Sequence, residues 1–135
     1  MTTIACTPRT MAADSWATDA NGIASVTKIW RFGDGVLGFA GTFAQGYQFV
    51  RWLECKRGDP PDIEGSAFLF IDGKQIWCYD GCPDPYPLDD KFAAIGSGGM
   101  AAMACMHLGC APDQAVRVAA KVDPNTGGKI KTMEV

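Results

Sequence analysis

The chain has 135 residues, of which 47% are hydrophobic, and its net charge at pH 7 is −3. A chain of this length buries roughly two thirds of the surface that it exposes when unfolded, so we expect a single domain over residues 1–135. The acidic balance without a cluster of Lys and Arg argues against nucleic acids or anionic membranes as partners. The longest apolar stretch, residues 100–108, falls short of the ~20 residues that a membrane span needs. Because no leader sequence opens the chain, we expect a cytoplasmic protein.

Alternating apolar residues and turn signals predict two hairpins in the first 40 residues. The strands are expected over residues 3–7, 10–13, 28–32 and 36–40. Pro8-Arg9 forms the first turn and Gly33-Asp34-Gly35 the second, because proline and glycine favour turn geometry. Residues 14–18 leave the first hairpin, and residues 19–22 read as a loop.

From Thr42 the apolar period changes to that of an amphipathic helix. Phe43, Tyr47 and Val50 fall on one face at helical spacing. The helix should end near Gly58, because a proline follows two residues later and disfavours helical geometry in the residue before it.

The second half of the chain predicts four more strands and two helices. The strands are expected over residues 67–71, 75–79, 91–95 and 129–133. Residues 83–87 carry three prolines and predict a rigid surface loop. The glycines from Gly96 to Gly99 open a helix that runs to about Leu108, and Pro112 starts another that runs to about Val122. Grouped strands and grouped helices indicate an α+β fold.

Six cysteines raise the question of disulfides or a metal site. Their spacing contains no C-x-x-C pair, and free thiols are the default in a protein without a leader. Cys105 and Cys110 flank the only histidine, His107, but a zinc site needs four ligands. We interpret these residues as small buried side chains on a helix, and we predict no metal and no cofactor.

Thr2 is a candidate nucleophile, because removal of Met1 gives it both a hydroxyl and a free α-amine. Threonine with its own amine is a known form of activated nucleophile. The pKa of a terminal amine is about 7.7–8.0, so it can accept the hydroxyl proton near neutral pH. A threonine at this position is ordinary when taken alone.

Six short motifs follow one another in a fixed order. They are Thr2-Thr3-Ile4, Ala12-Ala13-Asp14-Ser15-x-Ala17-Thr18, Lys28-Ile29, Gly38-Phe39-Ala40-Gly41, Ala94-Ile95-Gly96-Ser97-Gly98-Gly99 and Asp123-x-x-Thr126-Gly127-Gly128. The series resembles the β-type subunits of the 20S proteasome and the bacterial HslV-type peptidase. That resemblance implies an N-terminal-nucleophile (Ntn) hydrolase, built as a four-layer αββα sandwich. Between Gly58 and Ala67 there is no room for the family's second long helix, so we expect one helix of the outer layer to be missing.

The resemblance assigns catalytic roles to matched residues. Thr2 matches the catalytic threonine, Lys28 the catalytic lysine and Asp14 the aspartate that orients it. A lysine ammonium lowers the pKa of a nearby hydroxyl and amine, and a buried lysine needs a carboxylate partner. Without the resemblance, Asp14 reads as a turn residue and Lys28 as a solvated charge at a strand end.

The remaining site residues are also implied by the resemblance. Ser97 matches the serine beside the nucleophile, while Asp123 and Thr126 match the pair that completes the site. Gly41 matches the glycine whose N–H points into the oxyanion hole, where one such donor is worth roughly 3 kcal/mol. The substrate-binding positions are Ala17, Thr18 and Phe39. Read alone, Ser97 is a helix N-cap and Asp123 a helix terminator.

The expected function is a threonine-type peptidase that cleaves peptide bonds through an acyl-enzyme on Thr2, in a ring-shaped homo-oligomer. Its substrate would be a peptide or an unfolded protein, and an ATPase unfoldase is a candidate partner. Two alternatives stay open. One is a non-catalytic, proteasome-like structural ring subunit that retains Met1. The other is an Ntn amidohydrolase that acts on a small amide.

Overall fold

The computed structural model describes residues 2–135, which form eleven strands and three helices in the order that follows. They are β1 (Thr3–Cys6), β2 (Thr10–Ala13), β3 (Trp16–Asp19), β4 (Gly22–Ser25), β5 (Ile29–Phe32), β6 (Gly35–Ala40), α1 (Phe43–Cys55), β7 (Ala67–Ile71), β8 (Ile76–Asp80), β9 (Tyr86–Leu88), β10 (Ala93–Gly96), α2 (Gly99–His107), α3 (Pro112–Val122) and β11 (Lys131–Glu134).

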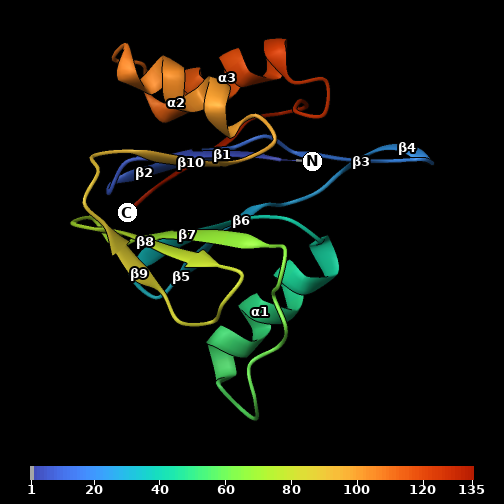
Figure 1. Ribbon diagram of the computed structural model, residues 1–135, viewed down its shortest axis with the longest axis vertical. Coiled ribbons are helices and arrows are strands. Elements are labelled where there is room, and N and C mark those ends of the chain that lie inside the picture. The colour runs from blue at the N-terminus through green and yellow to red at the C-terminus, as the bar shows by residue number, and fades with distance from the viewer. Residues whose placement is uncertain (1) are drawn as a thin grey trace.

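Two antiparallel sheets stack face to face between helices (Figure 1). The first sheet has the strand order β10-β1-β2-β11, and α2 and α3 lie over its outer face. The second sheet has the order β5-β6-β7-β8-β9, and α1 alone lies over its outer face. The expected four-layer αββα sandwich with a reduced outer layer is therefore confirmed.

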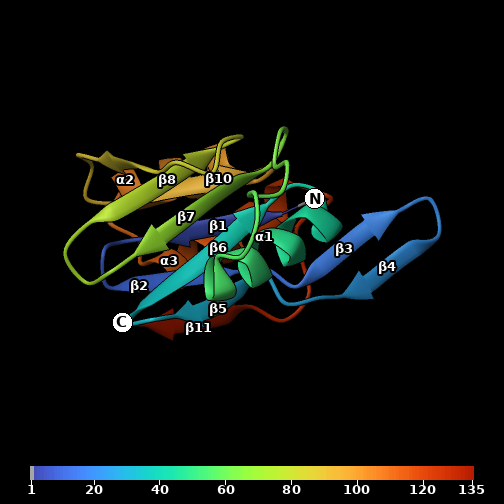
Figure 2. The same ribbon diagram turned by 90° about the horizontal axis from the view of Figure 1, so that it is seen from below.

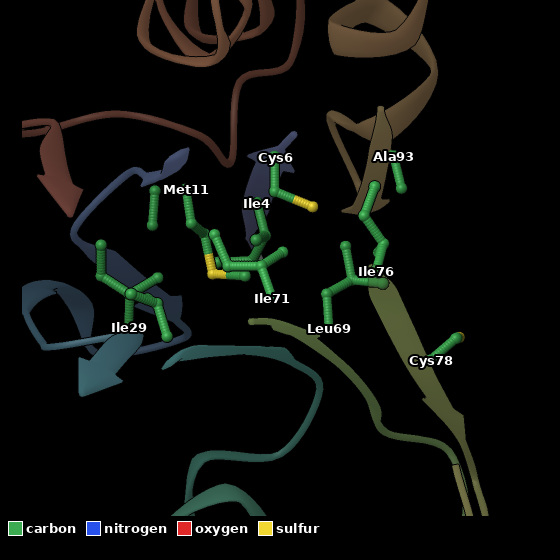
Figure 3. Close-up of a cluster of buried hydrophobic side chains, with 11 residues drawn as sticks. Ile4, Cys6, Met11, Ile29, Leu69, Ile71, Ile76, Cys78 and Ala93 are labelled. Carbon is green, nitrogen blue, oxygen red and sulfur yellow. The ribbon is translucent and has the colours of Figure 1, made fainter. Parts of the chain in front are cut away.

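Strand alternation separates the core into layers. In β1, Ile4 and Cys6 point into the space between the sheets, whereas Ala5 points toward α2 and α3. Figure 3 shows the layer between the sheets, where Ile4 and Met11 of the first sheet meet Ile71 of the second. A third cluster of aromatic and aliphatic side chains fills the space under α1. The small residues on the outer face of β1 and β2 allow α2 and α3 to pack closely on the first sheet.

Helix α1 ends earlier than the sequence indicates. Its last residue is Cys55, and Lys56 adopts a left-handed conformation with φ of 48°. The Lys56 N–H donates to the Trp52 carbonyl, which closes the last turn as a left-handed cap does. The prediction of an end near Gly58 was thus wrong by about one turn, because this local cap stops the helix before the prolines act.

Two further elements differ from the sequence prediction. Residues 16–19 and 22–25 form a separate hairpin, β3–β4, which projects away from the stacked sheets (Figure 2). Gly22 stands at its turn with φ of 116°, a conformation that glycine adopts without a Cβ clash. Residues 86–88 pair with β8 as the edge strand β9, whereas residues 86 and 87 were expected within the loop of residues 83–87.

Cys105 and Cys110 form a disulfide that joins the end of α2 to the residue before the N-cap of α3. This corrects the prediction of free thiols at these two positions. Four other cysteines, Cys6, Cys55, Cys78 and Cys82, are free thiols in the described chain. Within residues 2–135, none of the helices combines the length and the apolar character required to cross a bilayer.

Candidate active site

Asp14 lies directly after β2 and is held there by backbone groups. Its Oδ1 accepts a hydrogen bond of 3.0 Å from the Thr3 N–H, and its Oδ2 accepts one of 3.0 Å from the Gly127 N–H. The Asp14 N–H in turn donates to the Thr3 carbonyl at 3.3 Å. These contacts attach the carboxylate to the start of β1 and to the loop after α3. Asp14 is 1% exposed, so its orientation is set by the protein and not by water.

Lys28, the residue before β5, forms a buried ion pair with Asp14. Its Nζ lies 2.8 Å from Oδ1 of Asp14, and both side chains are completely buried. The ammonium also lies 5.8 Å from the centre of the Phe43 ring, within the range of a cation–π contact. Burial lowers the pKa of Lys28, while its hydrogen bond to Asp14 opposes that shift. The charge of Asp123 opposes the shift as well. A buried lysine that has a perturbed pKa and is paired with a carboxylate is a candidate for a functional site.

A second polar network surrounds Asp123, just after α3. Ser97 and Thr126 both donate their hydroxyl groups to Oδ2 of Asp123, at 2.5 Å and 2.6 Å. The Asn125 N–H donates to Oδ1 at 3.1 Å. Burial raises the pKa of Asp123, but the hydrogen bonds from Ser97, Thr126 and Asn125 outweigh it and leave this pKa below its ordinary value. Asp123 therefore stays ionised and orients the two hydroxyl groups.

Thr3 connects the two networks. Its N–H binds Asp14, and its Oγ1 lies 2.7 Å from Oγ1 of Thr126. Sequence reasoning gave Thr3 no role, although it stands in the first motif beside Thr2. The signal that could have identified it is strand alternation, which puts the side chains of Thr2 and Thr3 on opposite faces of the first sheet. One of the two residues then faces α3, where Thr126 lies.

Thr2 is held at the junction of β10 and α2. Its carbonyl accepts hydrogen bonds of 3.4 Å from the Ser97 hydroxyl and from the Gly98 N–H. Gly96 adopts φ of 98°, and a Cβ there would collide with the Thr2 carbonyl. Glycine is therefore required where this loop passes the start of β1.

A pocket of about 360 Å³ brings Thr2 together with two other expected site residues. Its lining consists of Thr2, Ala40, Gly41, Thr42, Gly65, Ala67, Gly96 and Ser97. Gly41, at the end of β6, and Ser97, at the start of α2, thus meet Thr2 although they lie far apart in the sequence. The lining contains no charged side chain within residues 2–135, and small residues keep the pocket open. Met1, whose removal the sequence interpretation requires, lies outside the described residues.

The three substrate-binding candidates lie in different surroundings. Ala17 and Thr18 belong to β3, and the Thr18 hydroxyl lies 3.5 Å from Oδ1 of Asn125. Phe39 is fully buried under α1, where its ring stacks on Trp30 and Phe68. Phe39 does not line the Thr2 pocket, and its neighbours Ala40 and Gly41 do. Its contacts in the structure are those of a core residue.

Asn125 and Gly127 contact the candidate site, although the sequence interpretation gave neither a role and only Gly127 stands in one of the six motifs. Asn125 contacts Asp123 through its backbone and Thr18 through its side chain, so it links the Asp123 network to β3. Gly127 binds the Asp14 carboxylate through its N–H. Among the described residues, no three His, Cys, Asp or Glu side chains gather in a way that could hold a metal ion.

Comparison with known proteins gives matches among solved structures alone. No protein-family model and no curated protein matches the chain. Two of these structures are of Thiobacillus denitrificans BPH. The one in complex with Epoxomicin superposes with a TM-score of 0.75 at 17% identity, and the other with a TM-score of 0.72 at 19% identity. These matches cover 98% and 99% of this chain, and 97% and 96% of those chains.

The eukaryotic HslV from Trypanosoma brucei is similar to the same extent. It superposes with a TM-score of 0.72 at 20% identity, over 98% of this chain and 99% of that chain. At such identities the likeness concerns the fold, and it extends over nearly the whole of each chain. The sandwich of two antiparallel sheets between helices, with β1 inside the first sheet, is therefore the fold that this chain shares with HslV and BPH.

Proposed function

We propose that this protein is a threonine peptidase of the HslV type, with Thr2 as its nucleophile once the residue before it has been removed. The observation that carries the proposal is the convergence of Thr2, Gly41 and Ser97 on one pocket. Behind that pocket, the buried Lys28–Asp14 pair is attached to β1 through the Thr3 N–H.

The proposed chemistry begins with the free α-amine of Thr2, which takes the proton of the Thr2 hydroxyl. The resulting alkoxide attacks the carbonyl carbon of a peptide bond, and the leaving amine departs with a proton to give an ester on Thr2. Water then hydrolyses this ester by the reverse proton path. The Lys28 ammonium favours the deprotonated forms of the hydroxyl and the amine through its charge.

The surroundings of Thr2 suit a developing oxyanion and a small or apolar substrate side chain. Gly41 is the proposed N–H donor, and one such donor is worth roughly 3 kcal/mol to the transition state. The small side chains of Ala40 and Ala67 leave space for the substrate residue before the scissile bond. The exposed edges of the β3–β4 hairpin, which carries Ala17 and Thr18, could pair with an extended substrate backbone.

The proposed setting is a homo-oligomeric ring in the cytoplasm, which acts on peptides or on chains delivered by an ATPase unfoldase. The structure of BPH in complex with Epoxomicin suggests that compound as an active-site probe. Epoxomicin should add its mass to the processed protein and leave Thr2→Ala unmodified. A measured oligomeric mass tests the ring separately.

Hydrolysis of short fluorogenic peptides by protein that begins at Thr2 tests the nucleophile directly. We expect Thr2→Ala to abolish cleavage and Thr132→Ala, at an exposed threonine of β11, to retain it. Cleavage by Thr2→Ala would refute the assignment. A protein that retains Met1 and does not react with Epoxomicin would favour the interpretation as a structural ring subunit. Hydrolysis of small amides without peptide cleavage would favour the amidohydrolase.

A further inference from the structure

A second pocket, of about 430 Å³, lies where the edge strands of the two sheets meet. Figure 2 shows β5 and β11 side by side along this edge, and the two strands are in contact. The lining consists of Ser15, Ser25, Val26, Thr27, Tyr47, Lys129 and Lys131. None of these residues lines the Thr2 pocket, so the two cavities are distinct.

The charged groups in this lining are both cationic. Lys131 is the first residue of β11, Lys129 precedes it by two residues, and both lysines line the pocket. Lys131 Nζ donates to the Thr27 hydroxyl at 3.0 Å, and an ammonium group has three donors. Neither Asp nor Glu belongs to the described lining. The wall formed by the start of β11 and the residues before it therefore offers two ammonium groups to a ligand that brings negative charge.

The opposite wall is amphipathic. Val26 contributes an aliphatic side chain, and Tyr47 on α1 contributes its ring while its hydroxyl donates to the Thr27 carbonyl at 3.3 Å. This hydrogen bond fixes the ring at the pocket. A volume of about 430 Å³ exceeds by far the ~30 Å³ that one water molecule occupies in the liquid. The space thus fits an anionic group together with an organic body.

We propose that this pocket binds a small organic carboxylate. Its carboxylate pairs with Lys129 and Lys131, and its apolar body lies against the Tyr47 ring. Ser15 and Thr27 are the chain neighbours of Asp14 and Lys28, so the ligand contacts the two chain segments that carry the buried ion pair. Charge-assisted hydrogen bonds from two lysines supply the recognition, and the aromatic wall selects an organic ligand over a bare inorganic anion.

Calorimetry of the full chain with benzoate, benzamide and inorganic phosphate tests the proposal. Benzamide has the shape of benzoate without its charge, so benzoate should bind and benzamide should not. Lys129→Gln and Lys131→Gln should each weaken benzoate binding about tenfold, the equivalent of one charge-assisted hydrogen bond. Lys91→Gln, at an exposed lysine outside this lining, should leave the affinity unchanged.

Three results would overturn the proposal. They are equal affinity for benzoate and benzamide, an unchanged benzoate affinity in both lysine variants, and phosphate affinity equal to that of benzoate. The amide signals of Ser25 and Thr27 in ¹H–¹⁵N spectra report the location, and they should shift with benzoate and not with benzamide. The melting temperatures of the lysine variants serve as a control for folding. Values within a few degrees of the wild type would show that the variants are folded and that the weaker binding has another cause. Binding is measured without turnover, so the result is independent of the activity proposed for Thr2.

Discussion

Replacing Asp14 with Asn removes the charge partner of Lys28 and keeps the shape of the side chain. The ammonium lies 2.8 Å from Oδ1 of Asp14, and both side chains are fully buried. Removal of one partner from a buried ion pair costs about 3–5 kcal/mol, because the other charge stays buried without compensation. We expect Asp14→Asn to lower the free energy of unfolding by that amount at pH 7, from a total of about 5–15 kcal/mol for a typical domain.

This loss should shrink as the pH rises, because Lys28 in the variant can lose its proton. Burial lowers the pKa of Lys28 and Asp14 opposes the shift, so the pKa falls further when the carboxylate is removed. Between this folded-state pKa and the unfolded value of about 10.4, the unfolded chain binds more protons than the folded chain. Stability therefore rises with pH by up to about 1.36 kcal/mol per unit. In the wild type the same rise begins at higher pH, since Asp14 holds the proton on Lys28.

Urea unfolding at pH 7 and pH 9, followed by the fluorescence of the four Trp residues, measures both effects. The double variant Asp14→Asn with Lys28→Met should recover much of the loss, because it also removes the buried ammonium that has lost its ion pair with Asp14. Asp113→Asn supplies the control, since the Asp113–Arg117 pair at 3.6 Å is exposed and should contribute less than about 1 kcal/mol. An unchanged urea midpoint for Asp14→Asn, or an equal loss at both pH values, would refute the buried charged pair.

Further predictions concern other parts of the site and the core. The Gly96→Ala variant should unfold at a lower urea concentration than the Gly109→Ala variant. Both glycines have φ near 98°, but an added Cβ would collide with the Thr2 carbonyl at Gly96 and would meet open space at Gly109. Burial raises the pKa of the Cys6 thiol to about 12. Iodoacetamide at pH 8 should therefore modify the exposed Cys55 and leave Cys6 unmodified until urea unfolds the chain. Mass spectrometry measures the modification of both cysteines. The lowered pKa of Asp123 adds stability above its unfolded value of about 3.9, which is lost as the pH falls through the folded value. The stability difference between wild type and Asp123→Asn, measured by urea unfolding, should therefore shrink from pH 7 to pH 3.

The local sequence pattern was sufficient to predict most strands, because the alternation of apolar residues and the turn residues act over a few positions. The hairpin β7–β8 has the boundaries that its apolar alternation and the Asp72-Gly73 turn indicate, within one residue. Strand β4 was missed, since its residues are all exposed and it has no buried face to produce alternation. The end of α1 and the Cys105–Cys110 disulfide depend on cap geometry and on the approach of two helices, which sequence spacing does not encode.

The candidate site was predicted from the order of its motifs and not from any one residue. Asp14 and Lys28 each suit an ordinary surface position. Their burial as a pair follows from the stacking of the two sheets, which local sequence patterns do not predict. The substrate-binding role of Phe39 stays a prediction, since its ring packs on core aromatics and its neighbours Ala40 and Gly41 line the Thr2 pocket. Thr3 and Asn125 received no role because the hydrogen bonds Thr3–Thr126 and Thr18–Asn125 join residues more than 100 positions apart in the sequence.

The position of Thr2 is a consequence of strand register. Strand β1 lies between β2 and β10 and runs antiparallel to both, so it begins where both neighbours end. Ala13 at the end of β2 pairs with Ile4, and Gly96 at the end of β10 pairs with Thr3. The next residues, Asp14 and Ser97, therefore lie beside the start of β1, one on each side of the strand. A slip of one residue in either pairing would shift these groups by about 3.3 Å and turn alternate side chains to the other face. Substitutions that loosen the pairing of β1 should thus abolish the proposed activity before they unfold the protein.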